Sequence, residues 1–490
     1  MLVLRFSGAQ VHRCWFFGSQ VLGCIGSGAQ VHRFLTSFLA ALVCGAVLVT
    51  SIGAQPRHGW LAPLRRDADR LIKAATANDF AWQRLAELTD TFGARLSGSE
   101  NLDRAVRWAV KTMTADGLQN VRAEPVLVPH WVRGRESAEI VDPPHHTLSV
   151  LGLGGTMPTP PGGLEAEVLV VSSVEELRSR AAEARGRIVL FDVAYNGYVD
   201  TVSYRNSGAR EAAQYGAVAV LVRSIAPAGL RTTHTGSVSY VPGVSAIPAA
   251  AVAVEDANRL ARLTRGGRRV RLRLVLEGRF EPDTQSANVV AEIVGREKPN
   301  EIVLLGGHLD SWDVGTGASD DAVGCIVTWE AARLMVKLGI RPRRTIRVVL
   351  WTNEENGMRG ASAYAEKYGA SASDHVFALE SDLGVFAPAA LGFSGSQPAR
   401  SMIAQIGSLL GALGFPEIAA GGGGADIGPI AQAGRVPTMA YIGDAGRFFV
   451  IHHSAADTVD RILPEEVSKA VAAIAVVTYA VAEMPERLPR

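Results

Sequence analysis

Short apolar runs and helical patterns alternate from residue 285 to the end of the chain, and this alternation limits the fold more than any other feature. The apolar runs cover 288–294, 302–306, 345–352 and 376–381, and helical spacing covers 322–338, 361–368, 399–413 and 464–482. Strands that alternate with helices are typical of a mostly parallel (mixed) sheet with helices on both faces. We therefore predict an α/β fold, in which ligands bind at the carboxyl ends of the strands.

Acidic and histidine residues follow four apolar runs, where the predicted strands end. They are His308, Asp310, Asp320 and Asp321 after 302–306, Glu354 and Glu355 after 345–352, Glu380 and Asp382 after the apolar residues 376–379, and His452, His453 and Asp457 after residues 448–451. Carboxylates that are buried together are unfavourable unless a cation compensates their charge. Imidazole and carboxylate are normal zinc ligands, and two zinc ions can polarise a carbonyl and supply hydroxide at neutral pH. The pattern therefore predicts a dinuclear metal centre with one unliganded carboxylate as a base.

Each of these groups has a common structural role when it is taken alone. An aspartate after a strand, such as Asp321 or Asp382, usually caps a helix, and a Glu-Glu pair is usually solvated. A His-His pair usually makes structural hydrogen bonds. Their occurrence together at four predicted strand ends favours the metal centre. Cys325 lies on an apolar helix face and is interpreted as a core thiol.

Residues 1–54 have the composition of a leader. They contain Arg5, Arg13 and Arg33, no acidic residue, and an uncharged apolar run over 34–52. We predict an export signal cleaved after Ala54, which places the mature protein in the periplasm or outside the cell with no stable membrane span. The alternative is a membrane anchor formed by 34–52, because about 19 apolar residues can just span a bilayer.

A short repeat within this leader affects where translation begins. The sequence SGAQVHR occurs at 7–13 and again at 27–33. A signal peptide normally starts close to its basic residues. We therefore hypothesise that translation begins near Val31 and that residues 1–30 lie upstream of the true start.

The region between the leader and the alternating segment has three parts. Helical spacing covers 66–116, and Ser97-Gly-Ser-Glu100 is interpreted as a capping box that starts a helix. Frequent prolines over 121–163 indicate a boundary or a loop. Residues 165–280 form a self-contained α/β pattern without a catalytic motif, and 281–285 are interpreted as a linker.

Four motifs resemble those of the zinc exopeptidase family that contains the secreted bacterial leucyl aminopeptidases, and within it a carboxypeptidase subgroup. They are GGHLDSWDVGTGASDD at 306–321, LWTNEENG at 350–357, ESDLG at 380–384 and HHSAADT at 452–458. The stretch RGRIVLFDV at 185–193 resembles the protease-associated domain, a non-catalytic module inserted in several exopeptidase families. The resemblance implies a catalytic domain over 55–125 and 285–490, interrupted by a protease-associated domain over 126–284.

The resemblance also implies a role for each residue of the motifs. One Zn²⁺ would be held by His308, Asp320 and Asp382, and a second by Asp320, Glu355 and His453. Glu354 would be the general base. Support for the ligands would come from Asp310, Asp321 and Asp457, and the peptide bond Asp320-Asp321 would be cis. The substrate pocket would include Trp312, Asp426 and His452. Aminopeptidases of the family often have Tyr where this chain has His452, so no oxyanion role of a tyrosine is implied here.

The expected activity is hydrolysis of dipeptides or short peptides, with a small peptide substrate and two Zn²⁺ per chain. One alternative is an aminopeptidase that acts on longer peptides, and another is a related single-zinc aminoacyl cyclase. A third is a catalytically inactive binding protein of the same fold. The 49 basic and 48 acidic residues leave no basic surface for nucleic acid. A homodimer is compatible with the sequence.

Overall fold

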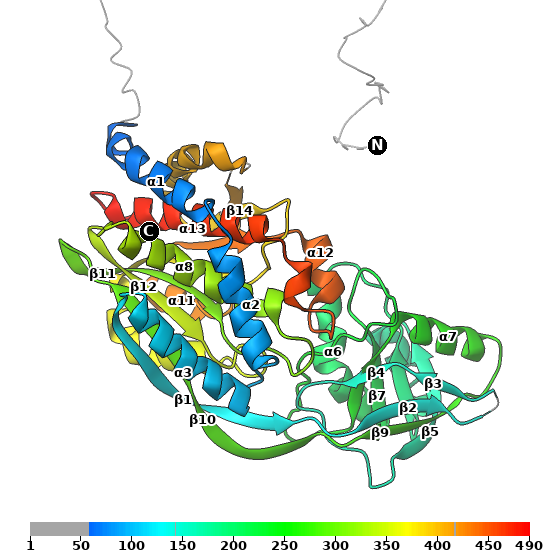
Figure 1. Ribbon diagram of the computed structural model, residues 1–490. Helices are drawn as coiled ribbons and strands as arrows, with labels where there is room; N and C mark the ends of the chain where they lie inside the picture. Colours follow the sequence, from blue (N-terminus) through cyan, green and yellow to red (C-terminus); the bar gives the residue numbers. More distant parts are fainter. Residues whose placement is uncertain (1–57, 143, 416–417) are drawn as a thin grey trace, which may run out of the picture. The chain divides into compact units, whose positions relative to one another are not determined.

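The computed structural model describes residues 58–142, 144–415 and 418–490 (Figure 1). The predicted leader, its cleavage site and the alternative start lie outside the described residues. Residues 56–490 form one compact unit that contains two 8-stranded sheets flanked by helices, as predicted for an α/β fold. Among the helices of the described ranges, none is long and apolar enough to cross a membrane.

The first sheet is mixed, with parallel strands at its centre. Its order is β1-β10-β12-β11-β13-β16-β14-β15. Strands β12, β11, β13 and β16 pair in parallel, and so do β14 and β15, whereas β1 pairs antiparallel with β10, β10 with β12, and β14 with β16. The bounds are β1 Gln119–Val132, β10 Arg279–Ile293, β11 Lys298–His308, β12 Arg344–Trp351, β13 His375–Ser381, β14 Ala390–Ser394, β15 Ala419–Ala420 and β16 Thr438–Ile442.

Apolar side chains alternate between the two faces of this sheet. Val303 and Leu305 pack in the main core with α8 and α13, whereas Leu304 packs on the opposite face with α9 and α11. Both faces are therefore covered, which explains the continuous apolar runs of the central strands. The helices that flank this sheet are α1 Arg65–Ala75, α2 Phe80–Phe92, α3 Glu100–Ala115, α8 Val323–Lys337, α9 Arg359–Tyr368, α10 Gln397–Gly407, α11 Gly428–Gly434, α12 Ala445–Ile451 and α13 Pro464–Glu483.

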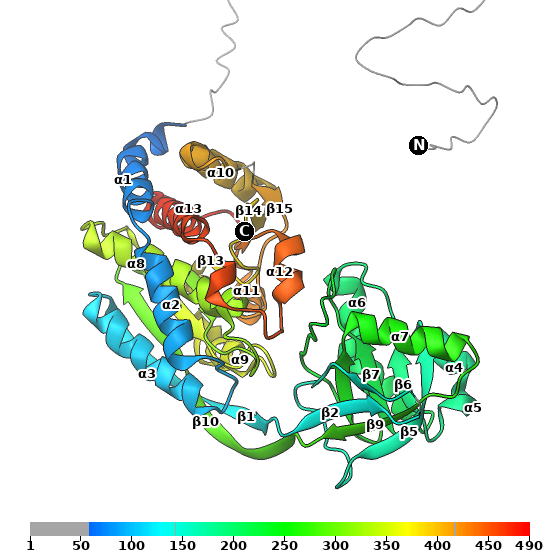
Figure 2. The same cartoon turned by 45° about the vertical axis from the view of Figure 1, so that its right-hand side comes forward.

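The second sheet is built from the chain between β1 and β10 (Figure 2). Its order is β3-β2-β9-β5-β6-β7-β8-β4, and α6 and α7 cover opposite faces of it. The strands are β2 Glu136–Ile140, β3 His146–Leu148, β4 Val150–Gly152, β5 Leu164–Val171, β6 Ile188–Phe191, β7 Ala219–Arg223, β8 Ala249–Val252 and β9 Arg271–Leu276. The helices are α4 Val174–Ser179, α5 Ala181–Ala184, α6 Tyr198–Ala213 and α7 Val254–Arg265. The division into two domains stays a prediction.

Two segments that we expected to be loops are strands. Pro125 and Pro129 lie within β1, which is the edge strand of the first sheet and pairs along its length with β10. An edge strand tolerates proline because one side of its backbone needs no partner. The predicted linker 281–285 lies inside β10, so the loop and linker assignments were wrong.

Two other local predictions were wrong. Helix α3 begins after Ser99, whose side chain accepts a hydrogen bond from the backbone N–H of Leu102, and not after Ser97. The apolar run 448–451 belongs to helix α12, so His452 and His453 follow a helix and not a strand. A run of four apolar residues fits a buried strand and one buried helical turn equally well.

Cys325 is a fully buried residue of α8, as predicted for a core thiol. Burial raises the pKa of the thiol well above its ordinary value, and the nearby charge of Asp321 adds to the effect. In a chain that starts at residue 55, we expect no reaction with a thiol reagent at pH 8 while the protein is folded. One thiol per chain should react after unfolding, which a colorimetric thiol titration measures. Rapid reaction of the folded protein would contradict the burial of this side chain.

Candidate metal centre

Most of the predicted site residues lie at the ends of the central parallel strands or in the loops after them, and His453 follows a helix. His308 is the last residue of β11, and Asp320 lies in the π-helical turn Ala318–Ala322 before α8. Glu354 and Glu355 occupy the turn after β12. Asp382 directly follows β13, and His453 lies two residues after α12. Parallel strands present their carboxyl ends at one edge of a sheet, so residues far apart in the sequence meet there.

Asp320 lies between two imidazoles. Its Oδ1 is 3.2 Å from His308 Nε2, and its Oδ2 is 3.1 Å from His453 Nε2. Each imidazole also faces a carboxylate of its own: Asp382 Oδ1 is 3.3 Å from His308 Nε2, and Glu355 Oε2 is 3.0 Å from His453 Nε2. Asp320 is therefore shared by two groups of possible ligands.

The carboxylates of this cluster lie close together, with Glu355 buried and Glu354 and Asp382 partly buried. Burial raises the pKa of Glu354 well above its ordinary value, with contributions from the charges of Asp382 and Glu355. Burial also raises the pKa of Glu355 to about 7, and it raises the pKa of Asp382. Such shifts mean that the ionised forms need a compensating cation.

Burial acts on the pKa of the two imidazoles in the opposite direction, but the neighbouring carboxylates outweigh it. Burial alone would lower the pKa of His308, but contacts with Asp320 and Asp382 raise it well above its ordinary value. Burial likewise opposes protonation of His453, and the neighbouring Glu355 and Asp320 raise its pKa. The negative charge that raises the pKa of each imidazole is the charge that a bound metal cation would compensate.

Several buried polar atoms of the cluster have unused hydrogen-bonding capacity. Within the described ranges, His308 Nε2, Asp320 Oδ2 and Glu355 Oε1 have no hydrogen-bond partner. Buried polar atoms are normally paired, and an unpaired one indicates a missing partner such as an ion. The donor set, imidazole nitrogen with carboxylate oxygen, fits zinc.

Asp310 connects two parts of the cluster. Its backbone carbonyl lies 2.9 Å from His308 Nδ1, whereas its carboxylate is 3.9 Å from that nitrogen. The carboxylate instead accepts hydrogen bonds from the backbone N–H of Glu354 at 3.1 Å and of Glu355 at 3.3 Å. Asp310 thus orients the imidazole through its main chain and the turn of the two glutamates through its side chain.

Asp321 and Asp457 hold the backbone of the ligand loops. Asp321 accepts hydrogen bonds from the N–H of His308 at 2.9 Å and of Gly324 at 3.1 Å. Asp457 accepts from the N–H of Ser319 at 2.7 Å and of Asp320 at 3.1 Å. The peptide bond Asp320-Asp321 is cis.

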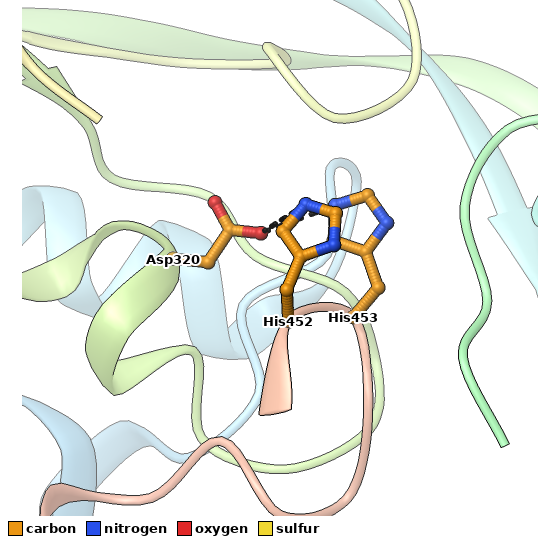
Figure 3. A group of neighbouring side chains, drawn as sticks. All are labelled: Asp320, His452 and His453. Carbon is orange, nitrogen blue, oxygen red and sulfur yellow. Dashed lines mark ion pairs between the residues drawn. The ribbon is translucent and has the colours of Figure 1, made fainter. Parts of the chain in front are cut away.

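Two of the three predicted pocket residues lie directly against the cluster. His452 Nε2 is 3.4 Å from Asp320 Oδ2, and its ring stacks on that of His453 (Figure 3). The ring of Trp312 packs edge-on against His453. Asp426 is buried beside Glu380, whose carboxylate accepts hydrogen bonds from the backbone N–H of Asp426 and Ile427.

Residues to which we assigned no site role also reach the cluster. Ser97 Oγ accepts a hydrogen bond from the amide of Asn353 at 3.0 Å and lies 3.4 Å from Asp310 Oδ2. Arg95 is fully buried and donates to the carbonyls of the loop after β11. Arg205 and His234 belong to the second sheet unit, which is the chain between β1 and β10. Arg205 contacts His453, and His234 contacts His452. No local pattern marks these residues, because their partners lie more than 200 positions away.

Comparisons with known proteins identify the family of this chain. The model of peptidase family M28 matches residues 288–478. Carboxypeptidase Q from Mus musculus is 46% identical over 410 residues, which are 84% of this chain and 87% of that protein. The chain belongs to peptidase family M28. The predicted family is confirmed, and so is the similarity to a carboxypeptidase subgroup.

Solved structures extend the comparison to the M28 fold. The peptidase M28 precursor from Shewanella amazonensis superposes with a TM-score of 0.83 at 34% identity, covering 87% of this chain and 98% of that one. A zinc aminopeptidase from Bacillus subtilis superposes with a TM-score of 0.63 at 19% identity, covering 83% and 96%. The second likeness shows that the fold is shared.

Replacing Asp310 by asparagine tests its contact with the turn of the two glutamates. The amide has one acceptor oxygen where the carboxylate has two, so one backbone N–H loses its partner. We expect zinc affinity to fall by about 10- to 100-fold, as for other residues that orient metal ligands. Competition with a chromophoric chelator measures this affinity, and Asp90→Asn, on the exposed face of α2, is the control. Wild-type affinity in Asp310→Asn would contradict the role.

Proposed function

We propose that this chain is a dinuclear zinc exopeptidase that hydrolyses dipeptides or short peptides. The observation that carries the proposal is the position of Asp320, with one carboxylate oxygen toward His308 and the other toward His453. His308, Asp320 and Asp382 would hold one Zn²⁺, and Asp320, Glu355 and His453 the other. The pairs of imidazole and carboxylate on each side of Asp320 support two ions.

Glu354 is the general base in this proposal. When bound, the two ions polarise the scissile carbonyl and lower the pKa of the attacking water. Glu354 Oε2 is 3.9 Å from His308 Nε2, farther than the carboxylates of Asp320 and Asp382, which supports a role for Glu354 as a base and not as a ligand. Its raised pKa favours acceptance of a proton from that water and its transfer to the leaving amine.

The exopeptidase activity is supported by the extent of the similarity to carboxypeptidase Q. The mouse protein is matched over 87% of its length at 46% identity. An aminopeptidase on longer peptides would use the same chemistry and differ in how the substrate termini are held. The inactive binding protein is disfavoured because every proposed ligand and the base are present.

One set of assays separates these activities. Purified protein is given dipeptides, tripeptides and versions blocked at the amino or carboxyl end, with and without chelator. A dipeptidase loses activity when either end is blocked, a carboxypeptidase only when the carboxyl end is blocked, and an aminopeptidase only when the amino end is blocked. Zinc-loaded protein that cleaves none of these peptides would refute the proposed function.

The proposal extends to the organisation and location of the protein. Residues 126–284 would form an inserted protease-associated domain, which the separate second sheet supports. The N-terminal signal would direct export and be cleaved after Ala54, and residues 34–52 would otherwise anchor the chain. Mass spectrometry of the precursor and of the mature protein tests both the start and the cleavage site. Sedimentation velocity tests the proposed homodimer.

A further inference from the structure

A short segment of the second sheet unit, residues 234–237, contacts the proposed metal ligands at the edge of the first sheet. The backbone N–H of Thr235 donates to the carbonyl of His453 at 2.9 Å. Ser237 Oγ donates to the carbonyl of Glu355 at 2.7 Å. His234 Nδ1 lies 2.7 Å from the carbonyl of His452. Two of these bonds hold the ligands proposed for one zinc ion, Glu355 and His453.

Arg205 of α6 holds this segment in place. Its side chain is buried, and Nη1 donates to the carbonyl of Thr235 at 3.1 Å, while Nη2 donates to Tyr198 Oη at 2.7 Å. The same Nη1 lies 3.2 Å from His453 Nδ1. Gly236 permits the contact, because a Cβ at that position would lie 2.2 Å from Arg205 Cζ.

The protonation of a metal-bound imidazole explains what these contacts do. An imidazole that binds a metal through Nε2 carries its proton on Nδ1, and that proton needs an acceptor. A guanidinium can only donate, so Arg205 is not this acceptor. The carbonyl of Thr235, 3.3 Å from His453 Nδ1, can accept the proton, and Arg205 fixes the same carbonyl.

The other imidazole of the centre has a local acceptor. His308 Nδ1 lies 2.9 Å from the carbonyl of Asp310, two residues further along the same loop. The half of the centre formed by His308 and Asp382 is therefore complete within the loops of the first sheet. The half formed by Glu355 and His453 depends on residues 234–237 and Arg205.

We propose that Arg205 and residues 234–237 position His453 and Glu355. The second sheet unit would then set the metal affinity of the half of the centre formed by these two residues, and not that of the half formed by His308 and Asp382. The inference rests on the proposed dinuclear function. Arg205 is a positioning residue in this scheme, because it acts through the carbonyl of Thr235 and the imidazole of His453. This positioning would give the second sheet unit a role in metal loading.

The test is a zinc titration of the metal-free full chain against a chromophoric chelator. Wild type should show two sites. Arg205→Met keeps much of the side-chain volume but removes every donor, and we expect it to weaken one site by about 10- to 100-fold and leave the other unchanged. Ser237→Ala removes one hydroxyl and should weaken the same site by a smaller factor. Arg210→Ala, on the same helix and paired with Glu211, is the matched control and should match wild type.

The outcomes of this titration are distinct. Two unchanged sites in Arg205→Met would overturn the inference, and so would equal weakening of both sites, which indicates a general structural defect. Thermal unfolding of the metal-free variants shows whether they are folded. Fewer than two zinc ions in wild type would instead refute the dinuclear function on which the inference rests.

Discussion

Replacement of Glu354 by glutamine is expected to lower kcat by about 10²- to 10⁴-fold, the usual contribution of a general base. Glutamine has nearly the same shape but cannot accept a proton from water. The backbone N–H of residue 354 keeps its hydrogen bond to Asp310, because that bond does not involve the side chain. Zinc content should therefore stay near that of wild type, and the loss should appear in kcat more than in KM.

The neighbouring residue provides the matched comparison. Glu355→Gln changes the same type of side chain one position later, at a proposed ligand 3.0 Å from His453 Nε2. This variant should lose zinc as well as activity. Steady-state kinetics on a dipeptide and metal analysis by mass spectrometry measure both quantities. Unchanged activity in Glu354→Gln would refute its role as base, and loss of zinc in that variant would make Glu354 a ligand.

Replacement of Asp320 by asparagine should affect both halves of the metal centre. The carboxylate faces His308 with one oxygen and His453 with the other, and the amide keeps only one oxygen that can bind a metal. We expect zinc to fall from about two per chain to about one or less, because the shared ligand is lost. Activity should fall below detection, since both ions act on the same carbonyl and water.

Thermal unfolding gives a second measure of the same change. A ligand that binds only the folded state stabilises it by about 4 kcal/mol at a concentration 1,000 times its Kd. Saturating zinc should therefore raise the Tm of the metal-free wild type clearly and that of Asp320→Asn much less. Asp313→Asn, which alters a carboxylate paired with Arg133, is the control and should respond like wild type. Two firmly bound zinc ions in Asp320→Asn would rule out a bridging role.

The sequence predicted the central part of the fold because its signals are local. Strands β11, β12 and β13 are buried on both faces, which produces continuous apolar runs, and the polar residues after them mark the edge where parallel strands end. The errors arose where a local pattern has two structural meanings. The run 448–451 is a turn of helix α12, and the prolines of β1 are compatible with an edge strand as well as with a loop.

The ligand types were also readable from the sequence, whereas their arrangement was not. Histidines and acids after apolar runs indicate a metal centre, but no spacing predicts that Asp320 faces His308 with one oxygen and His453 with the other. Ser97 shows the same limit. The sequence around it is that of a helix cap, yet its hydroxyl contacts Asn353 and Asp310.

The sequence by itself therefore determined the α/β class and the membership in a zinc exopeptidase family, and it supplied the residues proposed to carry the chemistry. Tertiary structure alone decided how the two sheets meet at the metal centre, where Arg205 and Thr235 reach His453. Helices and strands produce periodic patterns in the sequence because residues on one face recur every few positions. The contact between Arg205 and His453 spans 248 positions, and no periodicity records a contact of that length.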